Sequence, residues 1–251
     1  PAQAIVKIKE ENLALQQQRD WLLQANDLEE ADLATTPICP ICGGSGYIGA
    51  RMCDCLKELC RQEQKNELTS LLGTRKESFD NFRLDYYSAE FDSRLGSSPR
   101  KLIDLVFLDC QHYAKTFSLT SPSLFFIGAT GLGKTFLSGC IARAVADRGF
   151  SVVYDTAVHV FSQFEAEKFG NFSQETHQSV QKYTLCDLLI LDDLGTEMTT
   201  QLTISALYTL VNSRLSGGLP TIISTNLPVK EVESRYSAPI ASRILGCYEV
   251  Y

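Results

Sequence analysis

Gly128-Ala-Thr-Gly-Leu-Gly-Lys-Thr135 is the stretch of sequence that decides the fold. It follows an apolar segment at 123–127 and precedes a segment with the apolar spacing of a helix, at 134–148. A glycine-rich turn between a strand and a helix lets backbone N–H groups converge on phosphate oxygens, and the helix N-terminus adds partial positive charge. The stretch therefore predicts a phosphate-binding loop with a strand before it and a helix after it.

Two side chains of this loop are expected to act on a bound nucleotide. Lys134 reaches the β- and γ-phosphates, and the Thr135 hydroxyl ligates Mg²⁺. The backbone of the remaining positions forms the cradle: Gly128, Ala129, Thr130, Gly131, Leu132 and Gly133. A chance match in a glycine-rich turn is the alternative, but it would have to satisfy the flanking strand and helix as well. The loop thus predicts ATP or ADP with Mg²⁺ as the cofactors.

Two further apolar segments end in polar side chains. The segment at 187–192 ends in Asp192 and Asp193, and the segment at 220–225 is followed by Asn226. Ligands of α/β proteins bind at the carboxyl ends of parallel strands. We therefore expect Asp192 to hold Mg²⁺, directly or through water, and Asp193 to orient the attacking water. Asn226 would lie beside the γ-phosphate and hold that water, although such residues also merely cap or begin turns.

Strand and helix patterns alternate over the second half of the chain. We expect strands at 124–127, 151–155, 187–192 and 220–225, helices at about 100–117, 134–148 and 200–215, and polar helical segments up to about 184. This alternation predicts an α/β fold with a parallel sheet covered by helices on both faces.

Five of the nine cysteines lie between residues 39 and 60. Cys39 and Cys42, followed by Cys53 and Cys55, form two knuckles whose thiolates suit a closed, structural Zn²⁺ site. A segment this small needs the metal in order to fold. Cys60 is a spare ligand, and free thiols are the alternative. A catalytic zinc is disfavoured, because no histidine is nearby and four thiolates leave no open position.

The composition is that of a globular chain. Hydrophobic residues make up 44% and charged residues 21% of the 251 residues, which excludes disorder throughout. No apolar run reaches the ~18 residues of a membrane span, and the cysteine pattern suits a reducing cytosol. We therefore expect a cytoplasmic protein with no membrane partner. The formal charge of −7 is unlike that of proteins that coat duplex DNA, so any contact with nucleic acid has to be local.

The residues ahead of the cysteines predict a helix. Ile8, Leu15 and Leu22 repeat at seven-residue spacing among polar positions, which indicates an amphipathic helix with a narrow apolar seam. This helix packs either on its own domain or on a partner. The expected organisation is a helical partner-binding segment at 1–36, a zinc ribbon at 37–60, a linker at 61–99 and the P-loop core at 100–251.

An ordered series of motifs resembles the DnaC/DnaI-type helicase loaders, a group of AAA+ ATPases, over roughly residues 37–251. The series comprises Tyr86-Tyr87-Ser, the phosphate loop, Leu191-Asp-Asp-Leu-Gly-Thr-Glu197, Ile223-Ser-Thr-Asn-Leu227, Arg235-Tyr-Ser237 and Ser242-Arg-Ile244. The resemblance implies an ATPase that self-associates in a ring or spiral, binds a replicative DnaB-type helicase and helps load it onto single-stranded DNA. It also implies a sensor 1 role for Asn226 and an arginine-finger role for Arg243, with Arg235 as a rival.

Other functions remain open from the sequence. IstB-type transposition helper ATPases share the core but usually lack the cysteine ribbon, which favours the loader. AAA+ proteins commonly carry Asp-Glu where this chain has Asp192-Asp193, so a nucleotide-gated adaptor with little hydrolysis is a further alternative. A small-molecule kinase is disfavoured, because it would carry an arginine-rich lid and lack a sensor strand, and neither fits this sequence. No residue matches a sensor 2 arginine, so that part of the core is expected to be missing.

Contact with single-stranded DNA is expected just after the second core strand. Phe164 and Phe169 with Lys168 and Lys182 would supply base stacking and positive charge. The alternative is an ordinary amphipathic helix that turns its phenylalanines toward the core.

Overall fold

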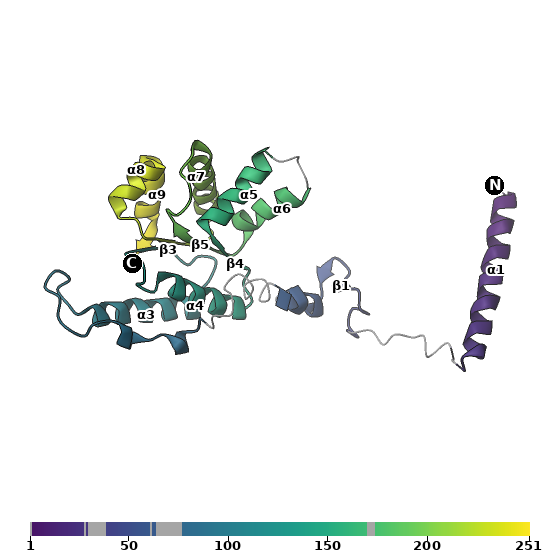
Figure 1. Cartoon of the computed structure of the whole chain (residues 1–251). Helices are drawn as coiled ribbons and strands as arrows, with labels where there is room; N and C mark the ends of the chain where they lie inside the picture. The colour runs from purple at the N-terminus through teal and green to yellow at the C-terminus, as the bar shows by residue number, and fades with distance from the viewer. Residues whose placement is uncertain (1, 28, 30–38, 61, 64–76, 170–173) are drawn as a thin grey trace. The chain divides into compact units, whose positions relative to one another are not determined.

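The computed structural model describes residues 2–27, 29, 39–60, 62–63, 77–169 and 174–251 (Figure 1). The chain forms two compact units, Pro1–Glu58 and Leu59–Tyr251. Among the described residues, no helix has both the length and the apolar composition needed to cross a membrane.

A five-stranded parallel sheet is the centre of the larger unit, with the strand order β4-β5-β6-β3-β7. The strands are β3 (Ser123–Ile127), β4 (Val152–Thr156), β5 (Leu188–Leu194), β6 (Thr221–Thr225) and β7 (Tyr248–Val250). The first four lie where the sequence predicts strands, so the predicted α/β fold with a parallel sheet is confirmed. The sequence does not predict β7, because this strand has three residues and follows a helix without a turn signal.

Helices cover both faces of this sheet (Figure 1). One face carries α3 (Pro99–Thr116) and α4 (Lys134–Asp147), and the other carries α5 (Ala157–Phe169), α6 (Gln174–Leu185), α7 (Gln201–Ser216), α8 (Val229–Tyr236) and α9 (Ala238–Cys247). Strand β5 shows why two layers form: Leu188 and Ile190 pack with α3 and α4, whereas Leu189 and Leu191 pack with the opposite helices. Successive side chains of a strand point to opposite faces, so an apolar strand requires helices on both.

Residues 77–98, which fall in the expected linker, pack against the core. They contain two short 3-10 turns, Phe79–Asn81 and Leu84–Tyr86. The Phe82 ring stacks on Phe107 of α3, with the ring centroids 4.8 Å apart. Sequence periodicity places the start of the core at residue 100, because these aromatic residues have neither helical nor strand spacing. The contacts add this segment to the core.

The smaller unit contains the predicted N-terminal helix, α1 (Ala2–Ala25), and the cysteine-rich segment. Within α1, Leu15 and Leu22 of the predicted seam are exposed, while the side chain of Ile8 and residues 30–38 lie outside the described part of the chain. The cysteine segment forms an antiparallel hairpin of β1 (Tyr47–Ile48) and β2 (Arg51–Met52).

Candidate nucleotide-binding site

The phosphate loop connects β3 to α4 as the sequence predicts. Gly128, Gly131 and Gly133 all have positive φ angles, and a Cβ at Gly133 would lie 2.7 Å from the hydroxyl of Tyr87. The Tyr87 hydroxyl also donates a hydrogen bond to the Leu132 carbonyl oxygen at 3.0 Å. The loop therefore depends on glycine both for its backbone conformation and for the close approach of the 77–98 segment.

Lys134 is the first residue of α4, and its side chain folds back over the loop. Its Nζ donates to the carbonyl oxygens of Gly128 at 2.7 Å and of Ala129 at 3.0 Å. Burial lowers the pKa of Lys134, while the charges of Asp193 and Asp192 act in the opposite direction. The ammonium group thus lies between the loop and the acidic strand, where a phosphate would meet it.

Asp192 is a buried carboxylate in the last part of β5, and it accepts hydrogen bonds from three hydroxyl groups. The Thr135 hydroxyl lies 3.3 Å from Oδ1, and the Tyr154 hydroxyl lies 2.6 Å from Oδ2. The Ser224 hydroxyl donates to Oδ1. Carboxylate and hydroxyl oxygens are the ligands that Mg²⁺ prefers, so the Thr135–Asp192 pair fits the predicted magnesium site.

Sequence reasoning missed Tyr154 and Ser224 as partners of Asp192. Tyr154 lies on β4, where the parallel register pairs it with Ile190 of β5, two residues before Asp192. Burial raises the pKa of Tyr154, and the charge of Asp192 adds to the shift, so the phenol remains a donor. Neither residue stands out in the sequence, because β4 and β6 contain other polar residues as well, and the partners of Tyr154 and Ser224 follow only from the strand order.

Asp193 departs from the regular strand. Its φ angle is 55°, the β5–β6 register shifts between Leu191 and Leu194, and its backbone N–H donates to the Ser224 hydroxyl at 2.9 Å. Bulges of this kind re-aim side chains next to functional sites. Burial raises the pKa of Asp193, followed by the charge of Asp192, while Lys134 opposes the shift.

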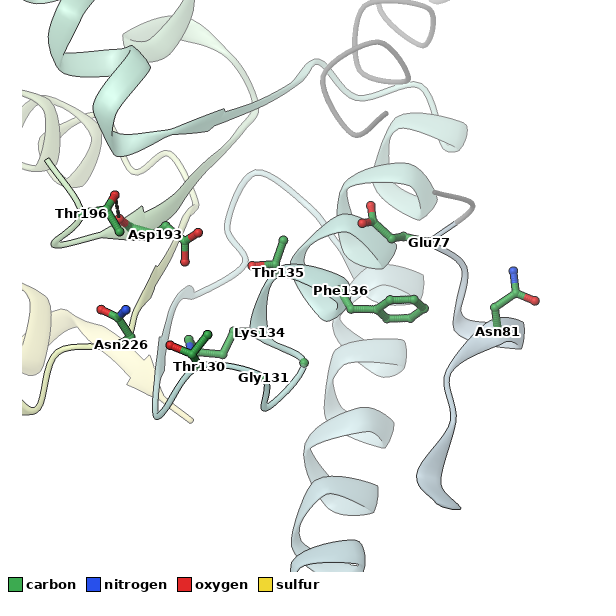
Figure 2. A pocket seen from close by; sticks show the side chains of 11 residues that line it. Glu77, Asn81, Thr130, Gly131, Lys134, Thr135, Phe136, Asp193, Thr196 and Asn226 are labelled. Carbon is green, nitrogen blue, oxygen red and sulfur yellow. Dashed lines mark hydrogen bonds between the residues drawn. The ribbon is translucent and has the colours of Figure 1, made fainter. Parts of the chain in front are cut away.

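One cavity of about 800 Å³ is lined by most of the residues predicted to bind the nucleotide and act on it (Figure 2). Asp193 and Asn226 lie on one side of the loop, and Phe136 lies on the other. The full lining is Glu77, Asn81, Thr130, Gly131, Gly133, Lys134, Thr135, Phe136, Asp193, Thr196 and Asn226. This volume is within the range of small-molecule sites. The structure therefore brings Lys134, Thr135, Asp193 and Asn226 together, and it adds Glu77, Asn81 and Phe136, for which no motif gave a signal.

Arg243 lies outside this lining, on α9. Its guanidinium donates to Asn212 Oδ1 at 3.2 Å and to the Tyr208 hydroxyl at 3.1 Å, and it stacks over the Tyr208 ring. The rival Arg235 donates to the carbonyl oxygen of Glu197 at 2.6 Å. Neither arginine reaches the cavity of its own chain, so a finger role for Arg243 stays a prediction that requires a neighbouring chain.

Of the residues predicted to contact single-stranded DNA, one phenylalanine packs into the protein and the other is exposed beside a lysine. Phe164 of α5 is half-buried and packs against the core, as expected for an ordinary amphipathic helix that turns its phenylalanines inward. Phe169 is 76% exposed, and the Lys168 ammonium lies 5.9 Å from the centre of its ring. The Lys182 ammonium lies over the Tyr183 ring.

The four predicted zinc ligands converge in the smaller unit. The sulfur atoms of Cys39, Cys42, Cys53 and Cys55 all lie within 4.8 Å of one another, with 3.8 Å between Cys39 and Cys53 and 3.4 Å between Cys42 and Cys55. Tetrahedral ligands with Zn–S bonds of about 2.3 Å have sulfur atoms about 3.8 Å apart. The donor set therefore fits zinc, and Cys60 is exposed and outside the cluster.

Comparison with known proteins places the larger unit in a family. The family of IstB-like ATP binding proteins matches residues 62–245. The replicative helicase loader DnaI of Bacillus subtilis is 26% identical over 159 residues, covering 61% of this chain and 49% of DnaI. The loader DnaC of Escherichia coli K12 is 25% identical over 134 residues, covering 53% and 54%. An ATP-binding protein in an insertion sequence of Mycobacterium tuberculosis is 27% identical over 123 residues, covering 49% and 48%.

Solved structures agree on the fold. AMPPCP-bound DnaA from Aquifex aeolicus superimposes with a TM-score of 0.55 and 19% identity, over 71% of this chain and 50% of DnaA. The DnaC helicase loader gives a TM-score of 0.54 with 20% identity, over 68% of this chain and 96% of that one. The chain spans about half the length of the curated relatives it matches. Because the family match covers well over half of its residues, this chain belongs to the family of IstB-like ATP-binding proteins.

Proposed function

We propose that this chain binds and hydrolyses ATP. The observation that carries the proposal is the single cavity lined by Lys134, Thr135, Asp193 and Asn226, with Asp192 buried behind Thr135. Three separate strands, β3, β5 and β6, deliver these side chains to one edge of the sheet. An acid and an amide beside the phosphate loop can hold and activate a water molecule, which favours hydrolysis over binding alone.

Each side chain has a distinct part in this reaction. Lys134 moves from the loop carbonyls to the β- and γ-phosphates and neutralises charge there. Thr135 and Asp192 would hold Mg²⁺, which would supply positive charge to stabilise the phosphates during transfer. Asp193 accepts a proton from the attacking water, and Asn226 positions that water. Arg243 acts on the nucleotide of a neighbouring chain in the assembled ring or spiral.

The ATPase assay that tests this proposal uses the full chain with Mg²⁺ and ATP at several protein concentrations. Steady-state release of phosphate is expected, rising per chain as the chains associate. Lys134→Ala removes the charge from the cradle and is expected to abolish turnover. Absence of turnover by the wild-type chain at all concentrations, with ATP bound, would favour the adaptor instead.

We also propose that the chain helps load a replicative DnaB-type helicase onto single-stranded DNA. The support is the order of its parts along the chain: the helix α1, then the cluster of Cys39, Cys42, Cys53 and Cys55, then the ATP-binding core. We propose that residues 1–36 form a partner-binding segment, 37–60 a zinc ribbon and 61–99 a linker ahead of the core at 100–251. Leu15 and Leu22 of α1 are 62% and 48% exposed, and they supply an apolar surface for the helicase.

Capture of the purified replicative helicase from the same source tests the loader proposal. The double variant Leu15→Ala/Leu22→Ala should lose capture and keep its ATPase activity. Its matched control, Gln16→Ala/Gln24→Ala, changes polar positions of the same helix and should keep both. Capture that survives the leucine changes would contradict a role for this helix.

A transposition helper is the second candidate. The relative from a Mycobacterium tuberculosis insertion sequence, 27% identical over 123 residues, favours it. The same capture experiment with a transposase encoded beside such a helper separates the two. Binding to the transposase and not to the helicase would select the helper.

A further inference from the structure

Glu197 is a buried carboxylate just beyond the acidic strand, and it is not among the residues that line the cavity. It is 6% exposed. Its Oε2 accepts a hydrogen bond from the Gly195 N–H at 2.9 Å, and its Oε1 accepts one from the Tyr236 hydroxyl on α8. Burial raises the pKa of Tyr236, and the hydrogen bond to Glu197 adds to the shift, so the phenol remains the donor. Both carboxylate oxygens of Glu197 are therefore engaged by the protein.

The turn that Glu197 holds is the one that carries Asp193. Asp193 and Gly195 have φ angles of 55° and 109°, and a Cβ at Gly195 would lie 2.6 Å from Leu227. A non-glycine residue keeps a positive φ only where its surroundings fix it. On the cavity side, the Thr196 hydroxyl donates to the Asp193 carbonyl oxygen at 2.9 Å (Figure 2).

Helix α8 supplies two consecutive anchors for this turn. Besides the bond from Tyr236, the Arg235 Nη2 donates to the Glu197 carbonyl oxygen at 2.6 Å, and its Nε donates to the Thr199 hydroxyl at 2.6 Å. Strand β6 fixes the other side, because the Thr225 hydroxyl donates to the Leu194 carbonyl oxygen at 2.6 Å. The turn is therefore held between β6 and α8.

We propose that Glu197 and Tyr236 are positioning residues that hold Asp193 and Thr196 in the geometry required for ATP hydrolysis. This inference rests on the proposed ATPase function. On this inference Glu197 acts through the backbone of the turn and does not itself activate the attacking water.

Four variants of the full chain test the inference. Glu197→Ala removes both hydrogen bonds, and Tyr236→Phe removes one. Glu197→Gln keeps both, because the amide oxygen accepts from the Gly195 N–H and the amide nitrogen donates to the Tyr236 oxygen. The control, Tyr113→Phe, removes a partly buried hydrogen bond to the Pro122 carbonyl oxygen, which lies just before the amino end of β3, away from the turn.

The first measurement is ATP turnover as a function of ATP concentration. A displacement of about 1 Å in a reacting group costs about 100-fold in rate, so Glu197→Ala should lower kcat by up to about 100-fold. Its KM for ATP should stay within about twofold, because the phosphate loop is untouched. Tyr236→Phe should fall between Glu197→Ala and the wild type, and Glu197→Gln and Tyr113→Phe should resemble the wild type.

The second measurement is hydrogen exchange of the backbone N–H groups at 193–200, which does not depend on hydrolysis. Faster exchange in Glu197→Ala and Tyr236→Phe, but not in Glu197→Gln, is expected. A Glu197→Gln variant as inactive as Glu197→Ala, with unchanged exchange, would overturn the inference and make Glu197 a proton acceptor. Wild-type kcat in Glu197→Ala would overturn it as well. If the wild-type chain has no turnover, the ATPase proposal fails, and unchanged exchange in Glu197→Ala then overturns this inference separately.

Discussion

Tyr154→Phe removes one hydrogen bond from the carboxylate that is expected to hold Mg²⁺. The Tyr154 hydroxyl lies 2.6 Å from Asp192 Oδ2, and the two residues are 5% and 3% exposed. A hydrogen bond to a charged group contributes about 1.5–3 kcal/mol to the free energy of unfolding. Each kcal/mol shifts Tm by roughly 2–4 °C in a domain of this size, so the variant should unfold at a temperature about 3–12 °C lower.

The same change should weaken the response to Mg²⁺. Tyr154 fixes the orientation of Asp192, and loss of a group that orients a metal ligand lowers metal affinity about 10–100-fold. Binding of a fluorescent ATP analogue is measured during a Mg²⁺ titration. The half-saturating Mg²⁺ concentration should rise by about that factor, whereas binding of the analogue in excess EDTA should stay unchanged.

Tyr183→Phe is the matched control for this experiment. The Tyr183 hydroxyl lies 2.8 Å from Asp155 Oδ2, and both residues of this pair are also buried. The control therefore loses a tyrosine–carboxylate hydrogen bond that does not involve Asp192. It should unfold at a lower temperature but show no shift in the Mg²⁺ titration. A wild-type titration for Tyr154→Phe, or the same shift in Tyr183→Phe, would refute the reasoning.

Three further predictions concern the metal site, the water-activating group and the subunit edge. Metal analysis of protein purified without chelator should find about one zinc per chain, and Cys39→Ser should lose that zinc and keep nucleotide binding; a metal-free wild-type chain would contradict the site. Asp193→Asn should bind ATP and fail to hydrolyse it, and normal hydrolysis by this variant would move the water-orienting role elsewhere. Burial raises the pKa of Asp193 and turnover needs its charged form, so wild-type activity should fall on acidification at a pH above the ordinary aspartate pKa. Arg243→Ala and Lys134→Ala chains, each nearly inactive alone, should recover turnover when mixed, because an arginine finger acts on the neighbour's nucleotide and contributes about 10³–10⁵-fold in rate; a mixture as inactive as its components would exclude action in trans.

The sequence predicts the parts of this protein whose chemistry lies within short contiguous motifs. The phosphate loop, the strand that ends in Asp192 and the four clustered cysteines are each read from fewer than twenty residues. Their flanking periodicity fixes strand and helix types, and parallel pairing follows from the alternation of the two. The sequence alone therefore predicts the α/β fold and the family.

Contacts between distant segments account for what the sequence does not predict. Tyr154 meets Asp192 only because β4 pairs with β5, and Tyr236 meets Glu197 across 39 positions of the chain. The 77–98 segment packs through aromatic residues without regular spacing, so no period signals that it belongs to the core. Arg243 illustrates the opposite case: a motif marks it, but its own chain does not bring it to the cavity.

The Asp192-Asp193 pair is the feature in which this chain departs from the common Asp-Glu pattern, and the backbone bears on what that departure means. A shorter side chain reaches less far from a regular strand. Asp193, however, leaves the regular strand at a bulge, takes a φ of 55° and lines the cavity. The main chain thus brings the carboxylate toward the phosphate loop, so the missing methylene does not by itself argue against hydrolysis. We therefore expect the rate of ATP hydrolysis to depend more on how firmly β6 and α8 hold the turn than on the side-chain length of residue 193.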